Sequence, residues 1–169
     1  MKTKESIKEI FKYEGRNVEI EWIECTNFSK LKNVTQAYGV LFNEVGEILI
    51  VSSSNGKKWG IPGGTPESKD KSFEETLIRE VDEEADVEIN EITPIGYQNS
   101  VFIGKLKSSH QQLRYTAKIT KIKKQTKDPA LNLIFLRKFI KPEEFLDYCP
   151  WGKTGKAMIE KAVEIWKKN

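Results

Sequence analysis

The sequence predicts an α/β (α+β) sandwich, in which helices cover a mixed β-sheet. Strand-like segments precede one amphipathic helix in the middle of the chain, more strand-like segments follow it, and a second amphipathic helix comes last. The chain has 169 residues, of which 38% are hydrophobic and 31% charged, an ordinary globular composition with the length of about one domain. We therefore expect a single domain over residues 1–169.

Several classes of protein do not fit this sequence. No stretch approaches the roughly 18 consecutive apolar residues of a membrane span, and the first residues lack the apolar run of a signal peptide, so we expect no membrane contact and a cytoplasmic location. Only Cys25, Cys149 and a single His110 are present, without metal-ligand spacing. This excludes a disulfide framework and a zinc site built from Cys and His.

The first 34 residues are expected to form an N-terminal extension of one helix and one strand. Residues 3–13 favour a short helix, because Ile7, Ile10 and Phe11 stand at helical spacing. Residues 17–24 alternate between apolar and polar side chains, as a half-buried strand does.

The later elements follow from periodicity and turn signals. In chain order we expect strands over 35–42 and 47–51 paired as a hairpin, a helix that begins at Ser72, strands over 87–107, 112–122 and 132–140, a short helix over 142–148 and a helix over 154–168. The middle helix has the clearest start, since Ser72 and Glu75 have the spacing of a capping box. Its apolar stripe recurs every four residues and ends near Asp86.

Three carboxylates of this helix are the strongest chemical signal in the sequence. Glu80, Glu83 and Glu84 share one helix face, where their mutual repulsion is best relieved by a cation. The glycine-rich turn at residues 60–64 comes shortly before the helix and can present backbone groups at close range. Hard oxygen ligands favour Mg²⁺ or Mn²⁺, so the two segments together predict a pocket for a metal ion and phosphates.

The same residues resemble the signature of a known family. Gly63-Gly64, Glu67 and then Arg79-Glu80-Val81-Asp82-Glu83-Glu84-Ala85-Asp86-Val87 are similar to the Nudix box, which reads G, five residues, E, seven residues, R-E-apolar-x-E-E-x-G-apolar. The box covers about residues 63–87. The resemblance implies an α/β/α sandwich and a hydrolase that acts on phosphoric anhydride bonds.

Two positions depart from the box. Counting back from Arg79, Lys71 stands where the first glutamate belongs, and the neighbouring Asp70 is the expected substitute. Asp86 replaces the glycine near the helix end, so it must adopt a cap conformation that glycine reaches more easily. We expect this second departure to cost some stability and to leave the chemistry unchanged.

The resemblance also implies roles for individual residues. Glu80, Glu83 and Glu84 would ligate Mg²⁺, for which Mn²⁺ could substitute, and the carbonyl of Gly64 would be a further ligand. Arg79 would orient a carboxylate, and Glu80 and Glu83 would take part in catalysis, with Glu83 our choice for the general base.

The sequence says less about the residues that bind the substrate than about those that bind the metal. We expect the backbone of Gly63 and Gly64 to face the phosphates, Trp59 beside them to stack on a base, and Arg114 or Lys118 to contact phosphates. The leading hypothesis is a divalent-metal-dependent pyrophosphohydrolase that cleaves a nucleoside diphosphate linked to another moiety. A nucleoside triphosphate, ADP-ribose and a nucleotide sugar all remain open as substrates.

Other functions depend on a basic segment. Lys105–Lys127 holds eight Lys or Arg and no acid, leaving 20 basic and 25 acidic residues elsewhere. It is either a solvated face or a strip that attracts phosphates or nucleic acid. The alternatives are therefore a catalytically weak domain that binds a nucleotide or RNA, and an RNA 5′-end pyrophosphohydrolase. A homodimer is a further expectation, because members of the family are often dimers and the segment before Thr35 lies outside the core pattern.

Overall fold

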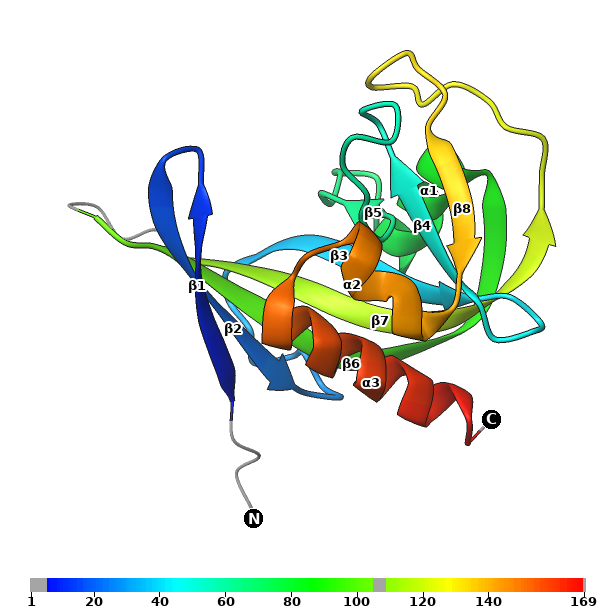
Figure 1. The fold of residues 1–169 in the computed structure, drawn as a ribbon. Coiled ribbons are helices and arrows are strands. Elements are labelled where there is room, and N and C mark those ends of the chain that lie inside the picture. Colours follow the sequence, from blue (N-terminus) through cyan, green and yellow to red (C-terminus); the bar gives the residue numbers. More distant parts are fainter. Residues whose placement is uncertain (1–5, 105–108, 169) are drawn as a thin grey trace.

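The strands of the protein join one mixed sheet in a computed structural model that describes residues 6–104 and 109–168 (Figure 1). The strands are β1 (Ile7–Tyr13), β2 (Arg16–Glu24), β3 (Val34–Phe42), β4 (Ile48–Ser52), β5 (Gly63–Gly64), β6 (Val87–Phe102), β7 (Ser109–Ile122) and β8 (Leu136–Ile140). Their order is β1-β2-β6-β7-β3-β4-β8, and β5 pairs with β3 outside this path. The β3 and β7 strands run parallel, whereas the other pairs are antiparallel.

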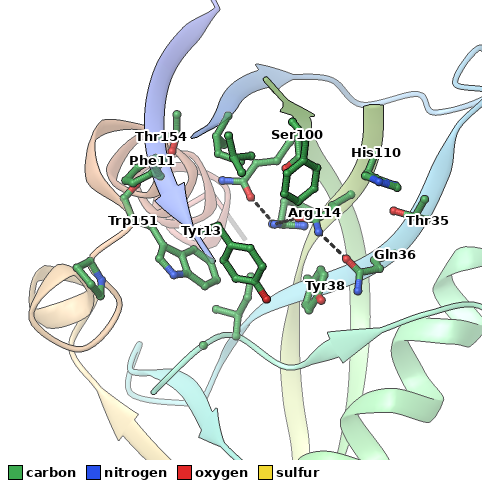
Figure 2. A pocket seen from close by; sticks show the side chains of 18 of the residues that line it. Phe11, Tyr13, Thr35, Gln36, Tyr38, Ser100, His110, Arg114, Trp151 and Thr154 are labelled. Atoms are coloured by element: carbon green, nitrogen blue, oxygen red, sulfur yellow. Dashed lines mark hydrogen bonds between the residues drawn. The ribbon is translucent and has the colours of Figure 1, made fainter. Parts of the chain in front are cut away.

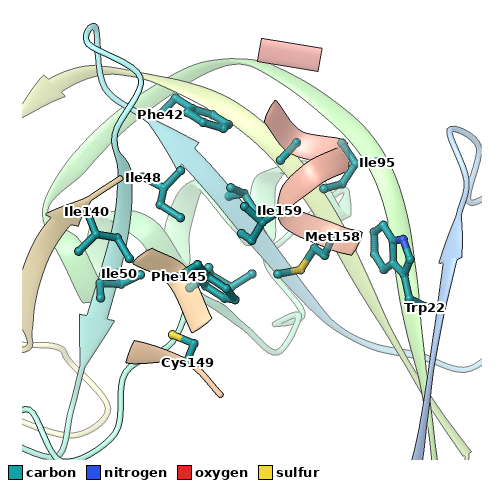
Figure 3. Close-up of a cluster of buried hydrophobic side chains, with 13 residues drawn as sticks. Trp22, Phe42, Ile48, Ile50, Ile95, Ile140, Phe145, Cys149, Met158 and Ile159 are labelled. Carbon is teal, nitrogen blue, oxygen red and sulfur yellow. The ribbon is translucent and has the colours of Figure 1, made fainter. Parts of the chain in front are cut away.

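Helices cover both faces of the sheet. They are α1 (Phe73–Ala85), the short α2 (Phe145–Tyr148), which follows a single 3-10 turn (Pro142–Glu144), and α3 (Gly152–Trp166). Alternate side chains of β3 face the two helical layers: Val40 and Phe42 pack under α3, while Leu41 packs under α1. Figure 3 shows the first of these clusters, in which Met158 and Ile159 of α3 meet the sheet. The predicted α/β/α sandwich is thus confirmed.

The start and the end of α1 lie where the sequence predicts them. The Ser72 hydroxyl accepts a hydrogen bond from the Glu75 backbone N–H at 3.2 Å. The Glu75 carboxylate in turn accepts from the N–H of Lys71 at 2.9 Å, one residue before the partner expected in a capping box. The helix ends at Asp86, which adopts the left-handed conformation with φ 51°.

The N-terminal helix predicted over residues 3–13 is wrong. Residues 7–13 form β1, whereas residues 3–5 lie outside the described part. β1 pairs with β2 through a two-residue turn in which Glu14 and Gly15 both have positive φ, and this turn type matches the twist of a hairpin. Ile7 and Phe11 fit the two-residue period of a strand as well as the period of a helix. The glycine turn that follows distinguishes a strand from a helix here, because it allows the segment to pair with β2.

Other boundaries also differ from the prediction. The β8 strand begins at Leu136 and not at residue 132, because the preceding segment folds as a loop around Asp128. The Asp128 carboxylate accepts from the N–H of Leu131 at 2.6 Å, and its own N–H donates to the Leu133 carbonyl at 2.9 Å. The strand predicted to reach residue 107 ends at Phe102, and residues 105–107 lie outside the described part. The β7 strand begins at Ser109 instead of residue 112, and the last helix spans Gly152–Trp166 instead of 154–168. Among the helices of the described chain, none has the length and apolarity needed to span a membrane.

Candidate active site

The glycine-rich turn brings backbone and carboxylates close together at the edge of the sheet. β5 pairs Gly63 with Tyr38 and Gly64 with Ala37. A Cβ atom on Gly63 would lie 2.2 Å from the Ala37 carbonyl oxygen, and one on Gly64 would lie 2.5 Å from the Glu80 carboxylate. Only glycines leave room here for both the strand pairing and the side chain from α1.

Arg79 organises the acids around it. Its guanidinium donates to the Asp70 carboxylate at 2.9 Å, to Glu80 at 3.0 Å and to Glu83 at 3.1 Å. It also donates to the carbonyl of Thr65 at 3.0 Å. The hydrogen bonds from Arg79 hold the pKa of the Asp70 carboxyl well below its usual range. Asp70, the expected substitute for the first glutamate of the box, is therefore the acid that pairs with this arginine.

Glu84 and Glu80 are partly buried carboxylates with raised pKa values. Burial raises the pKa of Glu84 to about 8, although the Gly63 N–H, which donates to its carboxylate at 3.0 Å, acts in the opposite direction. The charges of Glu80, Asp128 and Glu83 raise it further. Burial also raises the pKa of Glu80, against the lowering effect of Arg79. Asp128 is 5% exposed, and the sequence analysis did not single it out.

The donor chemistry of these residues fits a hard divalent cation. Within the described residues no three Asp, Glu, His or Cys side chains converge on one point, because Arg79 holds Glu80 and Glu83 while Glu84 faces Gly63. A buried carboxylate that keeps its proton near neutral pH is nevertheless the kind of group that a cation stabilises. A change of side-chain rotamer at Glu83 would free it from Arg79.

A cavity of about 920 Å³ adjoins this cluster (Figure 2). It lies on the α3 face of the sheet, between the β1–β2 hairpin and the segment at Trp151, and it reaches Gly60 and Thr65 of the glycine-rich turn. Thr65 contributes to both regions, since its carbonyl accepts from Arg79. Among the described residues, those that line the cavity include Lys12, His110 and Arg114 but no Asp or Glu.

The comparison with protein families identifies this arrangement. The NUDIX domain model matches residues 32–161. The chain belongs to the Nudix family. Family membership carries the reaction class, so the protein is a hydrolase that acts on phosphoric anhydride bonds. No curated protein sequence matches the chain.

Solved structures agree with the Nudix fold at low sequence identity. A mutant of the Bacillus subtilis pyrophosphohydrolase BsRppH has 18% identity and a TM-score of 0.63, and the match covers 95% of this chain and 96% of that one. MutT from Bacillus halodurans has 17% identity and a TM-score of 0.53, with 74% and 78% covered. The Caenorhabditis elegans Ap4A hydrolase complex has 14% identity and a TM-score of 0.51, with 79% and 99% covered. At these identities they show the fold.

The Nudix box residues come together, but two of the predicted substrate contacts lie elsewhere. Trp59 is not among the residues that line the cavity, and its ring packs edge-on against Tyr148 at 6.2 Å. Lys118 is also outside the cavity and pairs with Glu91 at 2.7 Å. Arg114, by contrast, lies at the cavity and is 2% exposed.

Three of the six described cations of the basic segment pair with neighbouring acids. Lys118 pairs with Glu91, Lys121 with Glu88 at 3.3 Å, and Lys123 with Asp82 of α1. Residues 105–108 of the segment lie outside the described part. For the remainder, these pairs favour a solvated face over a surface for nucleic acid.

Sequence reasoning missed most of the polar residues of the cavity. Tyr38 and three glutamines, at positions 36, 98 and 112, line it together with Arg114. Their signal is an i, i+2 pattern of polar residues on one face of three strands, as in Gln112 and Arg114 of β7. The pattern becomes meaningful only when the strands are known to be neighbours.

Proposed function

We propose that this Nudix hydrolase is a divalent-metal-dependent pyrophosphohydrolase that cleaves a nucleoside diphosphate linked to another moiety. The observation that carries the proposal is the cluster of Glu80, Glu83 and Glu84 at the glycine-rich turn, which also borders a cavity whose described lining includes cationic side chains and no acid. The carboxylates suit the metal, and the cavity suits an anionic substrate.

Each residue of the cluster has a role in this proposal. Glu80, Glu83 and Glu84 hold Mg²⁺ or Mn²⁺, with the Gly64 carbonyl as a further ligand. The bound ion supplies charge neutralisation for the diphosphate and activation of a water molecule. Arg79 fixes Glu80 and Glu83 relative to the turn through its bonds to Asp70 and Thr65.

Glu83 is the proposed general base. Its side chain is 22% exposed, compared with 14% for Glu80, so it is the more accessible of these two carboxylates to water. It would accept the proton of the attacking water while the second phosphate leaves. The proposal also includes a cytoplasmic location and a homodimer.

The test is the release of phosphate or pyrophosphate from a panel of substrates with Mg²⁺ and with Mn²⁺. The panel contains nucleoside triphosphates, ADP-ribose, nucleotide sugars, dinucleoside polyphosphates and a 5′-triphosphorylated RNA. We expect Glu83→Gln to abolish turnover and Asp82→Asn to retain it, because Asp82 belongs to the same helix turn but pairs with Lys123. Inactivity of the unmodified protein on the whole panel would contradict the proposal and favour a binding domain.

A further inference from the structure

Arg114 is a buried cation without an acidic partner. Its guanidinium donates to the side-chain oxygens of Gln98 and Gln112 and to the Leu113 carbonyl at 3.1 Å, and it lies 4.7 Å from the centre of the Tyr38 ring. Among the described residues no carboxylate forms an ion pair with it, and its Nε has no hydrogen-bond partner. A buried charge left this way is costly unless an anion compensates it.

The side chains around Arg114 can donate hydrogen bonds to such an anion. Tyr38 stands opposite Arg114 across the β3–β7 pair, and Ser100 stands opposite His110 across the β6–β7 pair. Figure 2 shows these four side chains at the same cavity, with Arg114 at its floor. The site therefore combines a guanidinium with several hydroxyl and ring N–H groups, a combination that suits phosphate oxygens.

Aromatic rings form the opposite wall of the cavity. Tyr13 of β1 meets Phe102 of β6 edge-on at 6.5 Å, and Phe11 and Trp151 also line the cavity. Figure 2 shows Tyr13 directed from the hairpin toward the space above Arg114. Tyr13 is 54% exposed, so its ring is accessible to a ligand in the cavity. Flat rings of this kind provide stacking surfaces for nucleobases.

The hairpin is held firmly enough to act as a wall. The carboxylate of Glu9 in β1 accepts from the backbone N–H of Thr154 at 2.8 Å, at the start of α3. A Cβ atom on Gly152 would lie 2.6 Å from the same carboxylate, so the helix start approaches Glu9 as closely as its backbone allows. The hairpin lies before residue 32, where the match to the family model begins, so it stands outside the matched part of the chain.

We propose that Arg114 and the N-terminal hairpin form a nucleotide subsite, in which Arg114 binds a phosphate and Tyr13 stacks on the base, with Phe102 edge-on beside it. The inference rests on the proposed function where it assumes that the bound phosphate leads toward the Nudix box, but the binding itself requires no metal. The cavity volume of about 920 Å³ lies within the range of small-molecule sites and is large enough for a nucleotide.

Calorimetric titration in EDTA tests the subsite without turnover. The probes are four nucleoside monophosphates, the matching uncharged nucleosides and ribose 5-phosphate. We expect at least one nucleoside monophosphate to bind more tightly than its nucleoside and than ribose 5-phosphate. Tyr13→Ala should weaken this binding about tenfold, because a base loses its stacking partner. Ile10→Ala is the matched control, since Ile10 is 62% exposed on the same strand and does not line the cavity.

Arg114 variants test the phosphate contact. Arg114→Gln should bind the nucleotide no better than the nucleoside, whereas Arg114→Lys should retain part of the difference. Circular dichroism checks their folding, and if they fail to fold, the Tyr13→Ala result alone decides the proposal. Three results would overturn it: no nucleoside monophosphate binds, Tyr13→Ala binds as the parent does, or a folded Arg114→Gln still prefers the nucleotide.

The same variants separate this inference from the proposed function. Binding in EDTA by a protein that hydrolyses nothing on the substrate panel would refute the pyrophosphohydrolase and leave the subsite intact. If Tyr13→Ala hydrolyses the substrate with the same KM as the parent, the subsite is refuted, whereas the proposed pyrophosphohydrolase function is not. Binding of a 5′-triphosphorylated RNA without binding of any mononucleotide would also overturn the assignment to a small nucleotide.

Discussion

Replacing Asp86 with glycine restores the residue that the Nudix box has at this position, and we expect it to destabilise the protein. Asp86 ends α1 in the left-handed conformation, where glycine is favoured. Its carboxylate, however, accepts hydrogen bonds from the N–H of Thr126 at 2.8 Å and from the Thr126 hydroxyl at 2.7 Å. These bonds fasten the segment after β7 to the end of the helix, and glycine removes both.

The balance can be worked out from these contacts. Two hydrogen bonds at a partly exposed site contribute about 2–3 kcal/mol. The greater freedom of glycine in the unfolded chain costs roughly 0.5–1 kcal/mol more. Because glycine adopts the left-handed conformation without strain, the substitution also stabilises the native state by about 1 kcal/mol. The net loss is about 2 kcal/mol, which lowers the Tm of a chain of this size by roughly 4–8 °C.

Urea unfolding measures this directly. The free energy of unfolding of Asp86→Gly should fall while the slope against urea stays unchanged. Asp86→Asn should lose less, because asparagine tolerates the left-handed conformation and keeps one acceptor. In Thr126→Ala the further effect of Asp86→Gly should be smaller, since one shared bond is already gone. A glycine variant as stable as the parent would refute the role of the Thr126 contacts.

Three further predictions concern the site and the hairpin. Gly64→Ala should keep the circular dichroism spectrum of the parent, but its kcat should be about a hundredfold lower, because the added Cβ displaces the Glu80 carboxylate. A kcat near that of the parent would contradict this. In EDTA, the free energy of unfolding should fall as the pH rises from about 4.3 to about 8, because over this range the native state keeps the Glu84 proton and the unfolded chain releases it. The melting temperature of Glu84→Gln should not show this fall. Glu9→Gln should lower the unfolding free energy by about 1 kcal/mol in urea titrations, through loss of the charge at the start of α3, and an unchanged value would show that the Thr154 contact is not stabilising.

The sequence predicts most of the fold because its periodic segments are long and their ends carry chemical signals. The α1 helix is an example, since Ser72 begins it and Asp86 ends it as expected. The N-terminal helix failed because seven residues with mixed spacing satisfy two periods at once, and pairing with β2 stabilises the strand. The β8 boundary failed because side-chain bonds of Asp128 keep apolar residues in a loop.

The site divides in the same way into local and long-range parts. Glu80, Glu83 and Glu84 could be singled out from the sequence because their spacing places them on one helix face and no other element is needed. Asp128 and Gln98 could not be found, because their place beside the acids or beside Arg114 depends on strand order and loop path. Lys118 and Arg114 are only four residues apart on β7, yet one pairs with Glu91 and the other lines the cavity. Composition alone cannot separate them.

The two halves of the site lie on different faces of the sheet, and the glycine-rich turn joins them. The carboxylates belong to α1, whereas the cavity opens on the face that α3 covers. Gly63 and Gly64 add no side chains between them, so Glu84 reaches the backbone of β5 while Thr65 lines the cavity. A larger side chain at either glycine would separate the acids from the cavity. This is a physical reason for the two adjacent glycines in the segment that leads to the carboxylate helix.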